Sequence, residues 1–265
     1  MNKLFVLNWK MNLPQKKEAE NLFKTTVKLA VKTKMAEIVV CPPFAYLEKF
    51  NEILKKTEAV RVSFLRVKRK IHLGAQNCFW KESGAYTGET SPLMLKELGC
   101  SYVILGHSER RLNLNENDEM INKKIKAAVK IGLKAVLCVG EKERDADFNY
   151  FDFVKNQIEN GLRGLSPRYL SNICVAYEPI WAISANKNSE ADDANDISTM
   201  MVFIRKTLFN FFNSEAVFGA PTLYGGSVNE NNIKKFLEIG EELNGFLMGG
   251  VSLNKDGLTK IFKNV

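Results

Sequence analysis

The stretch T-L-Y-G-G-S-V-N-E-N-N-I-K-K-F-L-E-I-G-E-E-L-N-G-F-L-M-G-G, residues 222–250, decides the fold. It opens on a short apolar run at 222–226 and closes on a second at 245–249, and both have the length and composition of buried strands. Between them, residues 230–239 show the spacing of an amphipathic helix. A strand, a helix and a strand in this order form a unit in which the two strands run parallel.

The same unit recurs along the whole chain of 265 residues. Eight strand–helix units with nearly continuous apolar strands favour a closed (β/α)₈ barrel over an open sheet. The sequence therefore predicts one α/β domain over residues 1–265, with eight parallel strands. Pro14 and Pro92 suit first helical turns, and Ser189 with Asp192 resembles an N-cap pair. The expected strands are 4–9, 37–41, 72–77, 102–106, 134–140, 172–178, 222–226 and 245–249, and the expected helices are 14–33, 44–56, 92–98, 117–131, 148–162, 192–211, 230–239 and 256–262.

Composition narrows the class of protein. The net charge is +8, but residues 61–70 (R-V-S-F-L-R-V-K-R-K) hold five of the cations and no acid, which leaves +3 for the rest of the chain. The protein is therefore not broadly basic, and we expect no nucleic-acid partner. Five cysteines without a C-x-x-C pair predict reduced thiols in a cytoplasmic protein, and two histidines argue against a histidine-rich metal site. No apolar run approaches the roughly 20 residues of a membrane span.

In a barrel of this kind the chemistry lies where the strands end. Reading only those positions brings together an amide and an ammonium after the first strand, an imidazole after the fourth and a carboxylate after the sixth. The last two strands each end in a diglycine, and these two loops commonly bind phosphate through backbone N–H groups. The residues at these strand ends are Asn8, Lys10, His107, Glu109, Glu178, Gly225, Gly226, Ser227, Gly249 and Gly250.

Each of these residues also has a plainer interpretation. A diglycine is usually a turn, a buried histidine is often a satisfied core residue, and a loop lysine is often solvated. Glu178 could cap a helix or form an ion pair, but the apolar Ile180 and Trp181 beside it would desolvate it and strengthen it as a base. The convergence of all these groups on one rim favours catalysis.

Six stretches together resemble the triosephosphate isomerase family, whose fold is the TIM barrel. They fall in the family's order, cover nearly the whole chain and are highly specific in combination. The stretches are N-W-K-M-N (8–12), Q-N-C-F-W-K-E-S-G-A-Y-T-G-E-T-S-P (76–92), V-I-L-G-H-S-E-R-R (103–111), A-Y-E-P-I-W-A-I (176–183), Y-G-G-S-V (224–228) and G-F-L-M-G-G-V-S-L (245–253).

The resemblance implies the interconversion of dihydroxyacetone phosphate and D-glyceraldehyde 3-phosphate, a step of glycolysis and gluconeogenesis. It makes Glu178 the base that moves the proton and His107 the electrophile at the substrate oxygens. A glutamate base paired with a neutral imidazole is the recognised pattern of this enzyme class. Lys10 would supply positive charge, Asn8 would orient the site, and Glu109 would support it. No metal and no organic cofactor is implied.

The resemblance also assigns binding and loop residues. The N–H groups of Ser227, Gly249 and Gly250 would hold the substrate phosphate, joined by Ser184 when the loop closes. The loop itself would comprise Pro179, Ile180, Trp181, Ala182, Ile183, Ser184, Ala185, Asn186 and Lys187. Thr87 would reach into the neighbouring subunit of a homodimer, near its Asn8 and Lys10, although an exposed turn is the plainer interpretation.

Three segments depart from the family's pattern. The usual Gly-Thr-Gly after Trp-Ala-Ile is replaced by Ser184-Ala185-Asn186, so we expect loop closure with an altered rate or equilibrium. A basic insertion around residues 59–70 precedes the third strand, as either a solvated extension or a docking surface for a polyanion. Residues 140–148 look shortened, although Glu141 remains where a carboxylate can meet Trp181.

Two rival functions remain. Other phosphate-binding barrels, such as sugar-phosphate epimerases or indole-pathway enzymes, share the two phosphate loops but not N-W-K together with G-H-S-E and Y-E-P. A barrel of this ancestry could also have lost catalysis, or gained surface binding through the basic insertion. The presence of Asn8, Lys10, His107 and Glu178 argues against a loss of catalysis.

Overall fold

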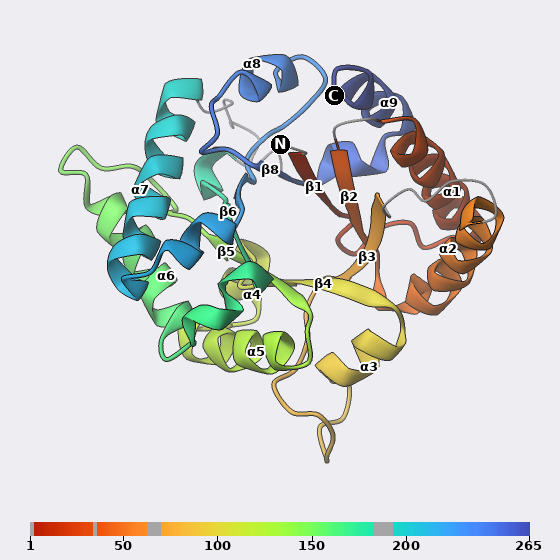
Figure 1. The fold of residues 1–265 in the computed structure, drawn as a ribbon, viewed down its shortest axis with the longest axis horizontal. Helices are drawn as coiled ribbons and strands as arrows, with labels where there is room; N and C mark the ends of the chain where they lie inside the picture. The colour runs from red at the N-terminus through yellow and green to blue at the C-terminus, as the bar shows by residue number, and fades with distance from the viewer. Residues whose placement is uncertain (1–2, 34–35, 63–69, 183–192) are drawn as a thin grey trace.

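The computed structural model describes residues 3–33, 36–62, 70–182 and 193–265, with backbone alone at 58–62. Its strands form a closed barrel in which each pairs in parallel with the next, and the last returns to the first (Figure 1). The predicted barrel of eight parallel strands is therefore confirmed. The strands are β1 (Lys3–Asn8), β2 (Ala36–Cys41), β3 (Ile71–Ala75), β4 (Cys100–Leu105), β5 (Lys134–Val139), β6 (Ile173–Tyr177), β7 (Thr222–Tyr224) and β8 (Gly245–Met248).

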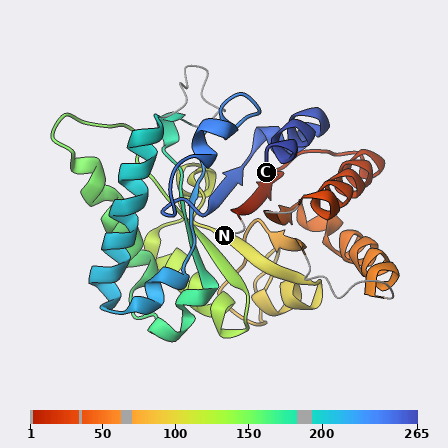
Figure 2. The ribbon, with the colours of Figure 1, turned by 45° about the horizontal axis from the view of Figure 1, so that its top comes forward.

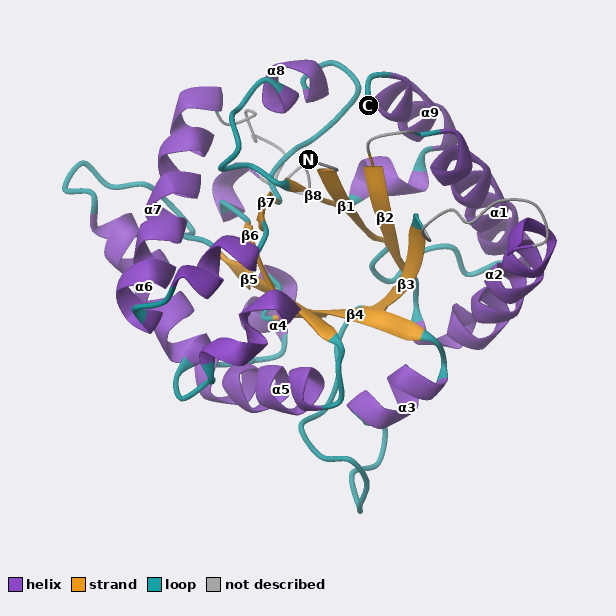
Figure 3. Cartoon of the chain, viewed as in Figure 1, coloured by secondary structure: helices purple, strands orange, loops and turns teal. Residues whose placement is uncertain are grey.

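Helices surround the barrel as an outer layer, and the two ends of the chain lie near each other (Figures 2 and 3). The α-helices are α1 (Lys16–Lys32), α2 (Leu47–Val62), α3 (Pro92–Glu97), α4 (Ser108–Asn113), α5 (Asp118–Lys130), α6 (Asn149–Leu162), α7 (Ala194–Phe212), α8 (Ile233–Leu237) and α9 (Lys255–Lys263). Short 3-10 turns also occur at Phe44–Tyr46, Pro167–Asn172, Ile180–Ala182, Glu215–Gly219 and Gly250–Leu253.

Some helix boundaries differ from the predicted ones. The first helix begins at Lys16 after Gln15, so the placement of Pro14 in its first turn is wrong, whereas Pro92 does begin α3. Asp193 caps α7 through its side chain, and the predicted cap residues Ser189 and Asp192 lie outside the described residues. The sequence did not predict α4, because this helix has only six residues, which are too few to show a helical period.

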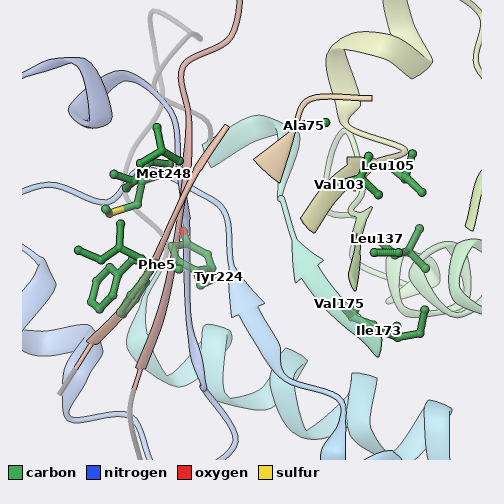
Figure 4. Packing of buried hydrophobic residues seen from close by; sticks show 14 of the residues in the cluster. Phe5, Ala75, Val103, Leu105, Leu137, Ile173, Val175, Tyr224 and Met248 are labelled. Atoms are coloured by element: carbon green, nitrogen blue, oxygen red, sulfur yellow. The ribbon is translucent and has the colours of Figure 1, made fainter. Parts of the chain in front are cut away.

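Alternation along the strands sorts the apolar side chains into two sets. Leu4 and Val6 lie in the cluster inside the barrel with Val39 and Cys41, whereas Phe5 belongs to the larger cluster between strands and helices. Figure 4 shows members of this outer cluster, with Phe5, Tyr224 and Met248 together on one side and Val103, Leu105 and Leu137 on another. Because successive side chains point to opposite faces, every second residue of each strand faces the barrel axis.

The same alternation carries two polar side chains onto the axis at the end of the barrel. Asn8 follows Leu4 and Val6 at two-residue steps, and Glu178 follows Cys174 and Ala176 in the same way. Both polar residues are buried, with Asn8 at 5% and Glu178 at 4% exposure. The strands thus place these groups at the carboxyl end of the barrel without a special loop conformation.

A buried ionic cluster lies behind this end of the barrel. Lys124 of α5 donates from Nζ to Oε2 of Glu116 at 2.5 Å and to Oδ1 of Asn77 at 2.9 Å. Arg110 of α4 donates from Nε to the same Glu116 oxygen at 2.7 Å. Burial by itself would raise the pKa of Glu116, but the two cations outweigh it and leave that pKa below the ordinary value. The cluster joins α4, α5 and the loop after β3.

All five cysteines are buried and free. In the part of the chain that the structure describes, no helix is both long enough and apolar enough to cross a membrane. Residues 59–62 of the basic insertion continue the backbone of α2, and residues 63–69 lie outside the described residues.

We expect Lys124→Ala to lower the free energy of unfolding by about 3–5 kcal/mol, because it leaves a buried carboxylate without its main counter-charge. The neighbouring Lys123 is the matched control, since it pairs with Glu119 at 2.6 Å on the exposed surface. Urea denaturation at one fixed protein concentration measures both variants. Equal losses from Lys124→Ala and Lys123→Ala would contradict the structural role of the buried cluster.

Candidate active site

A cavity of about 260 Å³ opens at the carboxyl end of the barrel. The strand ends bring most of the predicted site residues to its wall, although they are far apart in the sequence. Its wall combines polar side chains with glycines. Among its lining residues are Asn8, Lys10, His107, Glu178, Gly225, Gly226, Gly249 and Gly250.

Glu178 and His107 face each other across the cavity. The Nε2 atom of His107 lies 3.0 Å from Oε1 of Glu178, and both side chains are buried. The other carboxylate oxygen, Oε2, is also buried, and the thiol of Cys138 adds a hydrogen bond that favours the ionised carboxylate. One oxygen of Glu178 is thus held by the imidazole, and the carboxylate as a whole is enclosed by the barrel end.

The orientation of His107 is set by the start of α4. His107 is the N-cap residue of this helix, and its Nδ1 accepts the backbone N–H of Glu109 at 3.3 Å. Because Nδ1 accepts this bond, the ring proton resides on Nε2, where it points at Glu178. The same N–H group opposes a second proton on Nδ1. The helix start therefore selects the tautomer that can donate into the cavity.

Charge around the pair shifts both pKa values. Burial lowers the pKa of His107, but the carboxylates of Glu178 and Glu109 act against burial and raise the pKa above its ordinary value. Burial likewise favours neutral Glu178, but the facing imidazole stabilises its carboxylate and leaves the pKa of Glu178 below its ordinary value. The carboxylate is therefore ionised at neutral pH and able to act as a base.

Lys10 reaches the cavity through an unusual backbone conformation. Its φ is +53°, a left-handed value that is uncommon for residues other than glycine. Two side chains hold this conformation: Asn8 Oδ1 accepts the Lys10 N–H at 3.0 Å, and Gln76 Nε2 donates to the Lys10 carbonyl at 2.8 Å. The Lys10 Nζ lies 2.6 Å from Oε1 of Glu109. Glu109 thus contacts Lys10 directly and also lies beside His107.

Gln76 contacts Lys10 in a way that the sequence did not predict. It belongs to the 76–92 stretch but carried no assigned role there. Besides the Lys10 carbonyl, its Nε2 atom donates to the carbonyl of Cys41 at 2.9 Å. A glutamine two positions beyond the last inward glycine of β3, Gly74, could have been recognised from the alternation of the strand.

Glycines leave room for the base. A Cβ atom on Gly225 would lie 2.6 Å from Cγ of Glu178, and one on Gly140 would lie 2.0 Å from the Glu178 carbonyl oxygen. Contacts this short cannot form without moving the chain. Gly225 N–H also donates to the Tyr177 carbonyl at 2.7 Å, directly before the base. Both glycines therefore permit the close approach of strand ends on either side of Glu178.

Among the residues predicted to bind phosphate, the two glycines after β8 line the cavity, but the N–H of Ser227 already has a partner. Gly249 and Gly250 line the cavity, and Gly250 begins a 3-10 turn, whose first N–H groups have no partners within the turn. Ser227 instead donates its N–H to the carbonyl of Ala182 at 2.9 Å. The two glycines therefore line the cavity, whereas Ser227 is tied to the loop after β6. Ser184 lies outside the described residues.

The first part of the predicted loop is compact. Pro179 and Ala182 are buried, and Ile180–Ala182 forms a 3-10 turn. The indole of Trp181 donates from Nε1 to Oε1 of Glu141 at 2.9 Å, which gives the Glu141–Trp181 contact suggested by the sequence. The remaining predicted loop residues, Ile183, Ser184, Ala185, Asn186 and Lys187, lie outside the described residues.

Thr87 lies in the loop between β3 and α3, which projects away from the barrel in Figure 1. Thr87 is exposed and makes no contact with the catalytic cavity of its own chain, whose lining residues come from other loops. A second hollow of about 420 Å³ lies beside the rim and includes Lys10, Met11 and Phe44. Met11 is 96% exposed there, an unusual position for so large an apolar side chain.

No group of three or more histidine, cysteine, aspartate or glutamate side chains suited to a metal ion occurs among the described residues. The site consists of a carboxylate, an imidazole, an ammonium group and backbone amides. Together, the barrel and the rim have the layout of a TIM-barrel enzyme, with groups suited to moving a proton next to a carbonyl.

Comparison with known proteins identifies the family. The family model for triosephosphate isomerase matches residues 3–265. The chain is 40% identical over 263 residues to a triosephosphate isomerase of Dictyoglomus thermophilum, covering 99% of both chains. It is 41% identical over 263 residues to one of Aquifex aeolicus, covering 98% of both, and 40% identical over 255 residues to one of Thermoanaerobacter pseudethanolicus, covering 96% of both. The chain belongs to the triosephosphate isomerase family.

We expect Gly225→Ala to lower kcat about tenfold or more without unfolding the protein, because the new methyl group displaces the Glu178 side chain. Gly219→Ala is the matched control, since no atom lies within 4 Å of a Cβ placed there. Steady-state kinetics and urea denaturation of both variants provide the measurement. A Gly225→Ala enzyme with an unchanged kcat would show that the position of Glu178 does not depend on this contact.

Proposed function

We propose that this chain interconverts dihydroxyacetone phosphate and D-glyceraldehyde 3-phosphate through an enediolate, with Glu178 as the base. The family assignment supports an isomerase of this class. The single observation that supports the residue roles is the pairing of Glu178 with His107 at 3.0 Å, in a cavity that Lys10 also lines. These groups suit abstraction of a proton from carbon next to a carbonyl.

The proton transfer follows from the positions of these side chains. Glu178 removes a proton from the hydroxymethyl carbon of the ketone, and the carbonyl oxygen gains the negative charge of the enediolate. Lys10 supplies positive charge to this oxygen. The Nε2–H of His107, which the substrate displaces from Glu178, donates to the substrate oxygens and moves a proton between them. Glu178 then returns its proton to the neighbouring carbon, which gives the aldehyde. The proton thus stays within the triose and Glu178, and the step uses no metal or cofactor.

Preformed donors make this site suitable for a charged intermediate. His107 is fixed by the start of α4, and the backbone of Lys10 is fixed by Asn8 and Gln76. Groups that are already oriented need little rearrangement when charge develops on the substrate, so they lower the barrier. We assign Asn8 and Glu109 as positioning residues for Lys10 and His107.

The substrate phosphate would bind at the ends of β7 and β8. Gly249 and Gly250 offer backbone N–H groups at the cavity, next to Lys10, whose Cε lies 3.2 Å from a Cβ placed on Gly249. Ser227 and Ser184 complete the proposed set, with Ser227 requiring the release of its bond to Ala182. Phosphate placed here extends the triose from the glycines toward Glu178 and His107.

A homodimer is part of the proposal. The loop that bears Thr87 is exposed and projects from the barrel, and the hollow beside Lys10 and Met11 is open. The loop of one copy could therefore enter the hollow of another. In such a dimer Thr87 would lie near the Asn8 and Lys10 of the other copy. We also propose the cytoplasm as the compartment, since all five cysteines are free and buried.

We expect Glu178→Gln to lower kcat about a thousandfold, because the amide cannot accept the proton while its shape is nearly the same. A coupled assay that follows the conversion of D-glyceraldehyde 3-phosphate measures this. Glu238→Gln, on the exposed surface at the end of α8, is the control and keeps full activity. A Glu178→Gln enzyme with more than about a tenth of the original kcat would contradict the assignment of the base.

We expect Thr87→Arg to shift the protein from dimer to monomer, because the larger charged side chain does not fit the recess beside Lys10. Sedimentation velocity over a dilution series measures the shift, and activity per chain falls in parallel. Asn149→Arg, on the exposed start of α6, is the control. A wild-type chain that sediments as a monomer at every concentration would refute the dimer.

A further inference from the structure

Glu141, in the loop after β5, is a buried carboxylate with two partners from the neighbouring strand end. It is 2% exposed, and its Oε1 accepts from the Tyr177 hydroxyl at 2.7 Å and from Trp181 Nε1 at 2.9 Å. Tyr177 precedes Glu178 directly, and Trp181 follows it by three residues. A carboxylate buried to this degree requires a compensating positive charge.

Arg144 supplies the positive charge. Its Nε lies 3.6 Å from Glu141 Oε1, and its Nη2 donates to the Tyr177 hydroxyl at 3.4 Å. Its guanidinium group stacks over the Trp181 ring with 4.7 Å between the guanidinium carbon and the ring centroid. Only the planar guanidinium can pair with a carboxylate and stack on an indole at the same time.

The same side chain also contacts two helices. The guanidinium lies over the ring of Tyr150 in α6 at 5.3 Å, and Nη1 donates to Oδ2 of Asp196 in α7 at 2.7 Å. Arg144 thus connects the loop after β5, the end of β6 and both helices, and 23% of its side chain remains exposed. One cation holds these elements together around Trp181.

We propose that Arg144 is a positioning residue for the isomerase reaction, which holds Glu141 and Trp181 in place and thereby fixes the turn that follows Glu178. This inference rests on the proposed function. Arg144 is not among the residues that line the catalytic cavity, so it acts through the groups that it holds.

Backbone hydrogen bonds connect this turn to the loops on either side of it. Ile180 N–H donates to the Glu141 carbonyl at 2.9 Å, and the Ala182 carbonyl accepts the N–H of Ser227 at 2.9 Å. A displacement of Glu141 or Trp181 therefore reaches both Glu178 and the phosphate-binding loop after β7. Catalysis is sensitive to such shifts, since a misplacement of about 1 Å can cost about a hundredfold in rate.

The first experiment compares the kinetics of arginine variants in the full-length protein. We expect Arg144→Ala to lower kcat about tenfold or more, with a smaller change in KM, because the reacting groups are misplaced while the cavity is retained. Arg144→Lys keeps the positive charge but not the planar group that stacks on Trp181. We therefore expect its kcat to lie between those of the wild type and Arg144→Ala. Arg168→Ala is the matched control, since Arg168 stacks on Tyr169 at the same 4.7 Å but lies on the exposed surface.

The second experiment separates charge compensation from packing. In Arg144→Ala the carboxylate of Glu141 is left buried without its cation, whereas the amide of Glu141→Gln carries no charge and its oxygen still accepts from Tyr177 and Trp181. We therefore expect the double variant, Arg144→Ala with Glu141→Gln, to have a higher kcat than Arg144→Ala alone. If Arg144 acts only through packing, the double variant will have the same kcat as Arg144→Ala, and charge compensation of Glu141 is refuted.

The third experiment observes Trp181 directly. Nitrogen-15 labelling gives indole N–H resonances for the three tryptophans of the chain, and Trp181→Phe assigns the one from Trp181. We expect this resonance to shift in Arg144→Ala and to stay unchanged in Arg168→Ala.

The proposal is overturned if Arg144→Ala leaves kcat and the Trp181 resonance unchanged, or if Arg168→Ala lowers kcat equally. If the wild-type chain fails to isomerise triose phosphates, the proposed function fails, and the resonance still decides whether Arg144 holds Trp181.

Discussion

The alternation of side chains along eight parallel strands, closed into a ring, is the constraint on which this structure depends. It fills the barrel interior from every second residue and directs the intervening residues to the helices. The same two-residue step takes Asn8 and Glu178 onto the axis at the rim. A one-residue slip of β6 would turn the base toward the helices and exchange the residues of its two buried faces, so packing and catalysis select the same register.

Electrostatics at the rim depends on this placement. Glu178 pairs with His107 at 3.0 Å in the cavity, and Lys10 pairs with Glu109, which lies beside the cavity, at 2.6 Å. Each carboxylate therefore has a cationic or hydrogen-donating partner, which offsets the cost of desolvation. The start of α4 adds a fixed N–H group at His107 Nδ1. The charged side chains of the site are therefore already in position before any substrate enters.

The fold and most of the rim could be predicted from sequence because both depend on short-range patterns. Strand periodicity and helix spacing were visible along the chain, and the strand-end rule then located Asn8, Lys10, His107 and Glu178. The role of Gln76 was missed because it depends on a left-handed backbone at Lys10, 66 residues away. Helix α4 and the start of α1 were misjudged since single turns and their caps carry too few residues for a period to appear.

Glycines explain why strand ends that bear a bulky base can approach one another so closely. Gly140 and Gly225 flank Glu178, and a side chain at either would overlap its backbone or its Cγ. The carboxylate is buried by this close approach, with 4% of Glu178 exposed, and the facing imidazole keeps it ionised. A base that is dry and ionised is more reactive than one exposed to solvent. The two glycines thus let the strand ends close around the carboxylate, and the imidazole that pairs with it keeps it ionised.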